Sequence, residues 1–306
     1  MSDLFLSPSR FTVVLPMVAL PLTEICHPPT IGYWTTYLAY YSLVGPQSNL
    51  RREHSVSMSL KVGRIPYMIC EPFYFDTERR GMQLVDTMPN RAAEEIEQGV
   101  IDAALVPVVD TFGKEDVFQP VGGFCIASTD RAGSVFLYSK VPIEELGDAR
   151  IALIEDSRTS VKLLQVLLKL RYQVEPGEYV GLRDEHDAFM VMGDRGLRQR
   201  RGARGFQHRY DLGEQWYEWT RLPFVYARWM ARQGIDSQAL AVLEDTLYVG
   251  LEDGVDTLYH ISEPRENLLM LPRDVVEYVQ GIRFYLGMTE QKSMRIFQEY
   301  VQQLDS

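Results

Sequence analysis

Residues 147–170 read GDARIALIEDSRTSVKLLQVLLKL, and this stretch decides how the rest of the chain is interpreted. It opens with a short aliphatic run at 151–154, which is typical of a buried strand. After a polar loop, apolar residues recur at the spacing of one helix face, at Val161, Leu164, Leu167 and Leu168. The stretch therefore predicts a strand, a loop and a helix in succession.

The loop of this stretch, residues 155–160, carries three hydroxyl side chains, those of Ser157, Thr159 and Ser160. They stand where the first backbone N–H groups of a helix lack intrahelical partners, and such helix starts attract carboxylates and phosphates. The alternative is that Ser157 or Ser160 only caps the helix. Both interpretations stay open at this point.

The composition of the 306 residues is that of an ordinary globular protein, with 46% hydrophobic and 24% charged residues. It excludes a disordered, fibrous or membrane-integral protein. A net charge of −11 argues against general binding to nucleic acid, because no excess of Lys and Arg is available to neutralise phosphates. Cys26, Cys70 and Cys125 show neither disulfide nor metal spacing, which indicates free thiols in a reducing compartment and no metal site.

The first 57 residues differ from the rest of the chain, because no hydrophobic period organises them. Their apolar run at 11–22 contains Pro16 and Pro21, is too short to span a membrane and is followed by no signal-peptide cleavage site. We expect residues 1–57 to be an N-terminal extension that is either poorly ordered or read from an upstream start codon. Neither chemistry nor membrane contact is expected there.

From residue 58 onward, short apolar runs alternate with helical patterns, which predicts a largely parallel sheet with helices between its strands. The expected strands are 61–66, 84–85, 103–109, 124–128, 135–140, 151–154 and 189–192. We therefore expect an α/β protein with two lobes, residues 58–132 plus 220–306 and residues 133–219. The double crossing between the lobes would form a ligand cleft.

Helical patterns fill most of the remaining chain. The expected helices are 72–80, 90–98, 161–168, 238–248, 251–259, 274–278 and 289–304. The arginine-rich residues 195–209 contain glycines and show no period, so we expect a solvated loop there. The alternative for this loop is that its arginines draw an anion toward the cleft.

Several blocks along the chain resemble one family in their order. These blocks are VGRIPYMICEPF at 62–73, DAALVP at 102–107, GSVFLYSK at 133–140, SRTSVKLL at 157–164 and DLGEQWYEWTRLPFVYARW at 211–229. Together they resemble chorismate dehydratase of the futalosine route to menaquinone, from about residue 58 to the C-terminus. The resemblance implies a type 2 periplasmic-binding-protein fold in a cytoplasmic enzyme without metal or organic cofactor. It also implies the loss of water from chorismate to give 3-[(1-carboxyvinyl)oxy]benzoate.

Chorismate is a dianion, so its site must satisfy two carboxylates away from water. Thr159 and Ser160, with Ser157 beside them, are the candidates for one carboxylate, and Ser134 for the other or for a hydroxyl. Asp194 is a candidate partner of a substrate hydroxyl, the alternative being an ordinary turn. No side chain stands out as the proton acceptor, and a carboxylate of the substrate itself is an alternative acceptor.

Two positions depart from the family pattern. The family carries Asn two residues after the aromatic residue of the first turn, where its amide is expected to contact substrate, but here Tyr67 and Met68 are followed by Ile69. Isoleucine can neither donate nor accept a hydrogen bond. Either a nearby group such as Tyr67 or Glu71 replaces the amide, or the chain is slow or has another ligand. Arg221 stands where a small glycine is usual, and it either adds a cation to the site or faces solvent.

Two function classes follow. The first is a lyase acting on chorismate, which the breadth of the resemblance favours. The second is a non-catalytic or differently catalytic binding protein for a small carboxylate on the same fold, which Ile69 favours because one fold hosts many functions.

Overall fold

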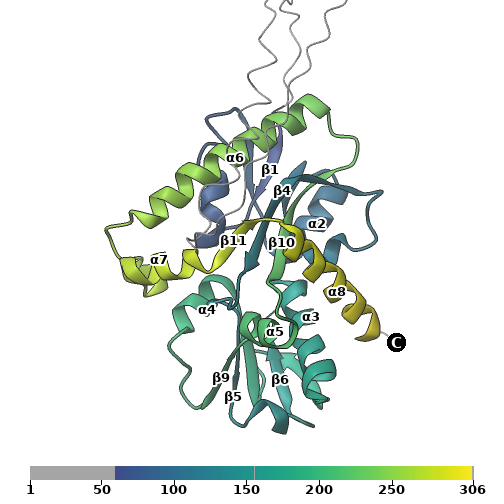
Figure 1. The fold of residues 1–306 in the computed structure, drawn as a ribbon, viewed down its shortest axis with the longest axis vertical. Coiled ribbons are helices and arrows are strands. Elements are labelled where there is room, and N and C mark those ends of the chain that lie inside the picture. Colours follow the sequence, from purple (N-terminus) through teal and green to yellow (C-terminus); the bar gives the residue numbers. More distant parts are fainter. Residues whose placement is uncertain (1–58, 155, 305–306) are drawn as a thin grey trace, which may run out of the picture. The chain divides into compact units, whose positions relative to one another are not determined.

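The computed structural model describes residues 59–154 and 156–304, and these residues belong to one compact unit. The expectation for residues 1–57 lies outside the described residues. Two β-sheets with helices around them build the unit, which is the α/β architecture that the alternating pattern predicts (Figure 1). Among the described residues, no helix has the length and apolarity needed to cross a membrane.

The larger sheet has the strand order β11-β4-β10-β3-β1-β2. Its strands are β1 (Lys61–Arg64), β2 (Gln83–Asp86), β3 (Ala103–Pro107), β4 (Phe118–Ser128), β10 (Phe224–Arg232) and β11 (Ile282–Tyr285). β1 pairs in parallel with β2 and β3, whereas β10 runs antiparallel to β3 and β4, and β11 antiparallel to β4. The parallel arrangement predicted from the strands at 61–66, 84–85 and 103–109 is confirmed for β1, β2 and β3, but it does not extend to the whole sheet, because β10 inserts antiparallel between β3 and β4. This sheet and the helices packed on it are called lobe 1.

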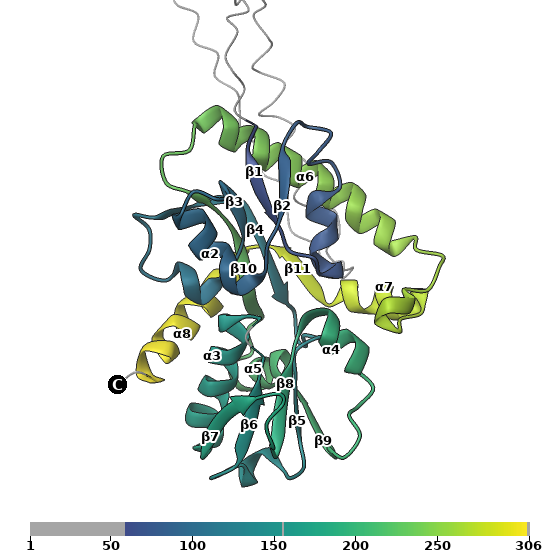
Figure 2. The ribbon, with the colours of Figure 1, turned by 180° about the vertical axis from the view of Figure 1, so that it is seen from behind.

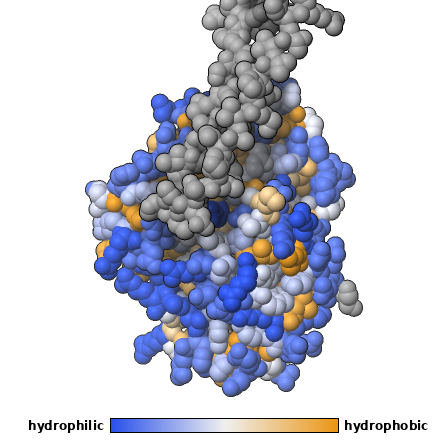
Figure 3. All heavy atoms as spheres, in the orientation of Figure 1, coloured by the Kyte–Doolittle hydropathy of each residue, from blue (hydrophilic) through white to orange (hydrophobic). Residues whose placement is uncertain are grey.

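Helices cover both faces of the larger sheet (Figures 1 and 2). The helices that precede β5 or follow β10 in the chain are η1 (Met68–Tyr74), α2 (Pro89–Glu97), η2 (Val108–Thr111), α6 (Ser237–Tyr259), η5 (Glu266–Leu268), α7 (Pro272–Gln280) and α8 (Met288–Leu304). Successive residues of β3 point to opposite faces, so Leu105 packs in the cluster with Leu243 of α6 while Val106 packs with Ile96 of α2. Hydrophilic residues dominate the coloured part of the face in Figure 3, as expected for side chains outside these clusters.

Two helix predictions need correction in lobe 1. The segment 72–80 was expected to be helical, but the helix there is the 3-10 helix η1, which starts earlier and contains Pro72. The two helices expected at 238–248 and 251–259 are the single helix α6. A Cβ at Gly254 would lie 2.5 Å from Pro72 Cα, so the glycines of this helix serve close packing on η1 and do not end the helix.

The smaller sheet has the strand order β7-β6-β8-β5-β9 and, with its helices, is called lobe 2. Its elements are β5 (Phe136–Ser139), η3 (Ile143–Glu145), β6 (Arg150–Leu153), α3 (Arg158–Val166), the π-helix η4 (Leu167–Tyr172), β7 (Glu178–Gly181), β8 (Ala188–Val191), α4 (Gly193–Gln199), β9 (His208–Asp211) and α5 (Leu212–Thr220). β6 pairs in parallel with β7 and β8, and β5 runs antiparallel to β8 and β9. The strand, loop and helix predicted for 147–170 are confirmed as β6, the loop and α3.

The arginine-rich segment was predicted to be a loop, but its first part is the helix α4. The glycine that suggested a loop is needed for packing, because a Cβ at Gly196 would lie 2.0 Å from the carbonyl oxygen of Ser134. Close contact between α4 and the start of β5 therefore replaces the apolar period that the sequence lacks.

The chain passes between the lobes twice, after β4 and before β10. α8 follows the second passage but packs on the core of lobe 2, where Phe297 meets Trp216 with ring centroids 5.7 Å apart. Arg221 lies at the second passage with φ +58, the left-handed conformation that favours glycine. Its exposed guanidinium lies over the Tyr217 ring, 5.8 Å from the centroid, which supports the solvent-facing alternative.

Candidate functional site

The turn after β1 meets the start of α4 across the boundary between the lobes. Met68 donates its backbone N–H to the Asp194 carboxylate at 3.1 Å. The Tyr67 ring packs against Gly193, where an added Cβ would lie 3.0 Å from the ring and where φ is +58. Gly193 is thus required twice, for its conformation and for its lack of a side chain. Two predicted site residues, Tyr67 and Asp194, are brought together here from 127 positions apart in the numbering (194 − 67).

The turn after β3 meets the start of α3 at a second place on the same boundary. Val109 donates its N–H to the Thr159 hydroxyl at 3.3 Å, and Arg158 pairs with Asp110 at 3.1 Å. Thr159 comes from lobe 2 and Val109 from lobe 1, so this hydroxyl is used in a contact between lobes. We call the contacts of Met68, Val109 and Asp110 with Asp194, Thr159 and Arg158 the inter-lobe seam.

Three predicted site residues are almost completely buried: Ser134 before β5, and Ser157 and Ser160 at the start of α3, have exposed fractions of 6%, 5% and 0%. Ser157 is the N-cap of α3 but makes no side-chain cap hydrogen bond, and the Ser160 hydroxyl has no partner among the described residues. The capping alternative therefore finds no support from Ser157. Ser134 accepts a hydrogen bond from the hydroxyl of Tyr278 at 3.0 Å, a pairing that sequence analysis missed.

Ile69, the position without the family amide, lies in the hydrophobic core of lobe 1 with an exposed fraction of 6%. Glu71, one of the two groups suggested to replace the amide, is held by Arg265 through two bonds of 3.2 and 2.7 Å. Tyr67 differs, because its hydroxyl is buried and has no partner among the described residues.

Burial dominates the electrostatics of the seam. It raises the pKa of the Tyr67 phenol, and the carboxylates of Asp156 and Asp194 add to this effect. It also raises the pKa of Asp194, against the opposing effect of the Met68 N–H. The pKa of Asp110 is raised by burial as well, although Arg158 opposes the shift. The seam therefore disfavours further negative charge on these groups and leaves neutral hydroxyls as hydrogen-bond donors.

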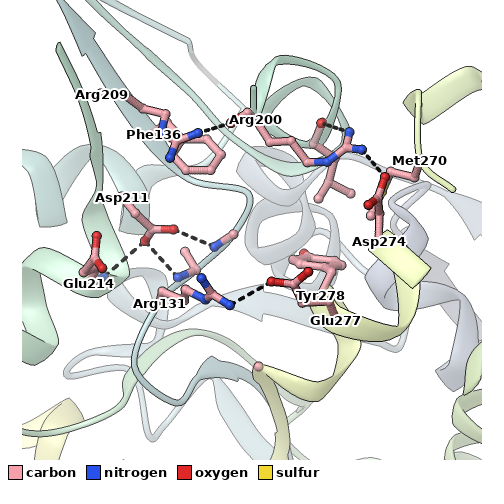
Figure 4. Close-up of a pocket in the computed structure, with 14 residues that line it drawn as sticks. Arg131, Phe136, Arg200, Arg209, Asp211, Glu214, Met270, Asp274, Glu277 and Tyr278 are labelled. Atoms are coloured by element: carbon pink, nitrogen blue, oxygen red, sulfur yellow. Dashed lines mark hydrogen bonds and ion pairs between the residues drawn. The ribbon is translucent and has the colours of Figure 1, made fainter. Parts of the chain in front are cut away.

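A cavity of about 300 Å³ lies where the first passage between the lobes meets α4 and α7 (Figure 4). Two ion pairs join its walls, Arg200 with Asp274 at 2.6 Å and Arg131 with Glu277 at 3.0 Å. None of the seven predicted site residues lines it, but Tyr278 does and reaches Ser134 with its hydroxyl. The cavity is thus linked to the predicted site through one hydrogen bond.

Asp211 ties the first passage to the start of α5 and was also missed by sequence analysis. Its buried carboxylate accepts the N–H groups of Ala132 and Gly133 at 2.8 and 2.7 Å, and those of Gly213 and Glu214 at 2.9 and 3.1 Å. Asp211 followed by Glu214 three positions later is a recognisable signal for the start of a helix. The contact of Asp211 with residues 132–133 has no local signal in the sequence. Within the described ranges, no group of three or more His, Cys, Asp and Glu side chains is arranged to hold a metal ion.

Comparison with known proteins gives the family of the chain and its fold. The family described as menaquinone biosynthesis matches residues 60–303. The chain belongs to this family. The description of this family, menaquinone biosynthesis, agrees with the resemblance of the sequence blocks. That prediction is therefore confirmed at the level of the family.

One relative of this menaquinone-biosynthesis chain is a chorismate dehydratase from Thermus thermophilus, 24% identical over 253 residues that cover 76% of this chain and 92% of the relative. Among solved structures, protein AF1704 from Archaeoglobus fulgidus is similar with a TM-score of 0.63 and 12% identity, covering 81% of this chain and 98% of that one. A Candida albicans protein described as having the generic periplasmic binding protein fold is similar with a TM-score of 0.50 and 10% identity, covering 81% and 90%. The predicted periplasmic-binding-protein-like fold is confirmed by these similarities.

Proposed function

We propose that this member of the menaquinone-biosynthesis family is a carbon–oxygen lyase that converts chorismate to 3-[(1-carboxyvinyl)oxy]benzoate. The observation that carries the proposal is the family match over residues 60–303, together with the relative named chorismate dehydratase that is covered over 92% of its length. The proposal includes a cytoplasmic location, in keeping with the biosynthetic family and with the buried free thiols Cys70 and Cys125.

The residues near the inter-lobe seam include groups suited to a dianion. Ser160, at the start of α3, has a buried hydroxyl without a partner, beside backbone N–H groups that attract a carboxylate. Ser134 is the candidate for the second carboxylate or a hydroxyl, with Tyr278 bound to its oxygen. Substrate would enter when the lobes separate. The Thr159 hydroxyl accepts from Val109 and keeps its own O–H as a further donor. Ser157 lies next to this group and is the remaining candidate.

The reaction removes the C4 hydroxyl and the C3 proton of chorismate as water and leaves an aromatic ring. Since the product is strongly favoured, the protein mainly has to orient the ring and stabilise charge on the departing oxygen. Neutral donors that are already fixed by burial suit this task, because they need no reorganisation when charge develops. Asp194 would accept from a substrate hydroxyl in this arrangement, as its second oxygen is not used by Met68.

A second candidate function is binding of a small carboxylate without dehydration. Ile69 favours it, because this position offers no polar atom and its side chain belongs to the core of lobe 1. The same seam would then serve ligand capture alone.

The test is incubation of the purified full chain with chorismate, with product formation followed by chromatography against a heat-inactivated sample of the same preparation. We expect 3-[(1-carboxyvinyl)oxy]benzoate to accumulate in proportion to protein concentration. Binding of chorismate in calorimetry, with product formation no faster than in the inactivated sample, would instead establish the binding function. Neither binding nor turnover would rule out both candidates for this ligand.

A further inference from the structure

The Tyr67 hydroxyl is an unsatisfied polar group at the boundary between the lobes. Its oxygen is buried and finds no hydrogen-bond partner among the described residues, although its ring is fixed against Gly193 of lobe 2. The backbone around it is fixed too, since its N–H donates to Ile65 at 2.9 Å and its carbonyl accepts from Cys70 at 2.9 Å. Leaving a hydroxyl buried without a partner is unfavourable, so a group held in this way needs an explanation.

The other polar groups of the same turn are already engaged. Arg265 holds both oxygens of Glu71, and Asp194 accepts the N–H of Met68. The Tyr74 hydroxyl accepts from the N–H of Ile65 at 3.0 Å and donates to the carbonyl of Gly63 at 3.3 Å. Among the described residues of this turn, the Tyr67 hydroxyl is therefore a side-chain donor that stays free for another molecule.

We propose that the Tyr67 hydroxyl donates a hydrogen bond to an oxygen of the bound substrate, in the turn where Ile69 offers no polar atom. This inference rests on the proposed dehydratase function and assigns the substrate contact of the first turn. Ile69 lies in the core, so the hydroxyl that this turn offers to substrate comes from Tyr67, two residues earlier.

The phenol acts as a donor and not as an acid. Burial raises its pKa, and the neighbouring carboxylates Asp156 and Asp194 raise it further, so the hydroxyl keeps its proton at neutral pH. A neutral O–H can approach a carboxylate or a departing hydroxyl oxygen of a dianion without adding negative charge. An O–H donor to an anionic oxygen also forms a short and strong hydrogen bond.

The experiment compares Tyr67→Phe with Tyr74→Phe in the full chain. Both variants remove one hydroxyl from the same turn and keep the ring. For Tyr67→Phe we expect an unchanged or higher thermal midpoint without ligand, a loss of the midpoint rise caused by chorismate, and a fall in kcat/KM of about ten- to a hundredfold, the range for one charge-assisted hydrogen bond. For Tyr74→Phe we expect a lower midpoint, because two backbone partners are lost, with kcat/KM close to that of the unmodified chain.

Two results would overturn the inference. A lower midpoint of ligand-free Tyr67→Phe would mean that the hydroxyl has a partner within the protein and is not free for substrate. Unchanged kcat/KM in Tyr67→Phe, with an active unmodified chain, would mean that substrate does not use it. An unmodified chain that neither binds nor converts chorismate would instead overturn the proposed function itself, which separates the two failures.

Discussion

Replacement of Asp211 probes the connection on which the arrangement of the two lobes depends. The carboxylate accepts four backbone N–H groups, two from the first passage between the lobes and two from the start of α5. Its exposed fraction is 7%, so water cannot readily replace it. Asp211→Ala leaves all four donors without their acceptor. Asp211→Asn keeps an oxygen for Ala132, Gly213 and Glu214 but places an NH₂ group against the N–H of Gly133.

The magnitudes follow from which donors are buried. The bonds from Ala132 and Gly213 are buried, whereas those from Gly133 and Glu214 are partly accessible and regain water. Each buried donor left unpaired costs about 1–3 kcal/mol, so the two together should lower the free energy of unfolding of Asp211→Ala by about 2–6 kcal/mol. Asp211→Asn loses only the charge-assisted bond from Gly133, worth about 1.5–3 kcal/mol before water regains part of it. Asp236→Ala is the control, since it removes the single, exposed cap bond to Ala239 of 2.9 Å, worth about 1 kcal/mol.

Urea unfolding followed by tryptophan fluorescence measures these differences, because Trp216 and Trp219 lie in α5 directly after the carboxylate. The midpoint and the slope give the free energy of unfolding for each variant. We expect the cost to fall in the order Asp211→Ala, Asp211→Asn, Asp236→Ala. If Asp211→Ala costs no more than Asp236→Ala, the carboxylate does not hold the passage and the reasoning is refuted.

Three further predictions concern predicted site residues. Ile69→Asn should lower the free energy of unfolding by about 2–4 kcal/mol without raising the dehydration rate, because it buries an amide in the core. The control Ile69→Val should lower the free energy of unfolding by only about 0.5–1.5 kcal/mol. A higher dehydration rate of Ile69→Asn in the chorismate assay would contradict the prediction. Ser160→Ala should leave the stability of the ligand-free chain unchanged or slightly higher and weaken chorismate binding by about 1–3 kcal/mol in calorimetry, and unaltered affinity would remove Ser160 from the site. Asp194→Asn keeps an acceptor for Met68 and removes a carboxyl whose pKa is raised above the unfolded value of about 4. The variant should therefore be more stable than the unmodified chain at pH 7, and urea unfolding at decreasing pH should show this advantage disappear toward pH 4. An advantage that grows at low pH would show the opposite shift of the pKa.

Local patterns in the sequence were sufficient for many elements of the fold. The change from an aliphatic run to helical spacing within residues 147–170 reports directly on β6 and α3, because both depend on which side chains one face buries. The same logic located β3, whose five residues are all buried. It failed at α4, where contact between Gly196 and Ser134 decides the conformation and no apolar period exists.

The site depends on pairings that no local pattern contains. Met68 and Asp194 are 126 residues apart, and Tyr278 and Ser134 are 144 residues apart. The block resemblance indicated which residues to consider, but not that the Thr159 hydroxyl is occupied by Val109. Tertiary contact decides which hydroxyls are free, and sequence spacing does not carry that information.

The seam and the passage differ in strength in a way that suits a clamp. The seam is closed by single contacts, Met68 to Asp194, Val109 to Thr159 and the half-exposed pair of Arg158 with Asp110. Contacts of this kind are worth about 0.5–1.5 kcal/mol each, so together they are worth only a few kcal/mol.

Binding a ligand with micromolar affinity releases about 8 kcal/mol, which exceeds that sum. Separation of the lobes would also break the pair of Arg200 with Asp274, the bond from Tyr278 to Ser134 and the packing of Phe297 on Trp216, so it costs more than the seam alone. It also requires that the passage between the lobes stays intact. The four bonds to Asp211 meet that requirement, because all of them join the first passage and the start of α5 to a strand of lobe 2 and none crosses the seam. Opening of the seam therefore leaves the Asp211 bonds in place.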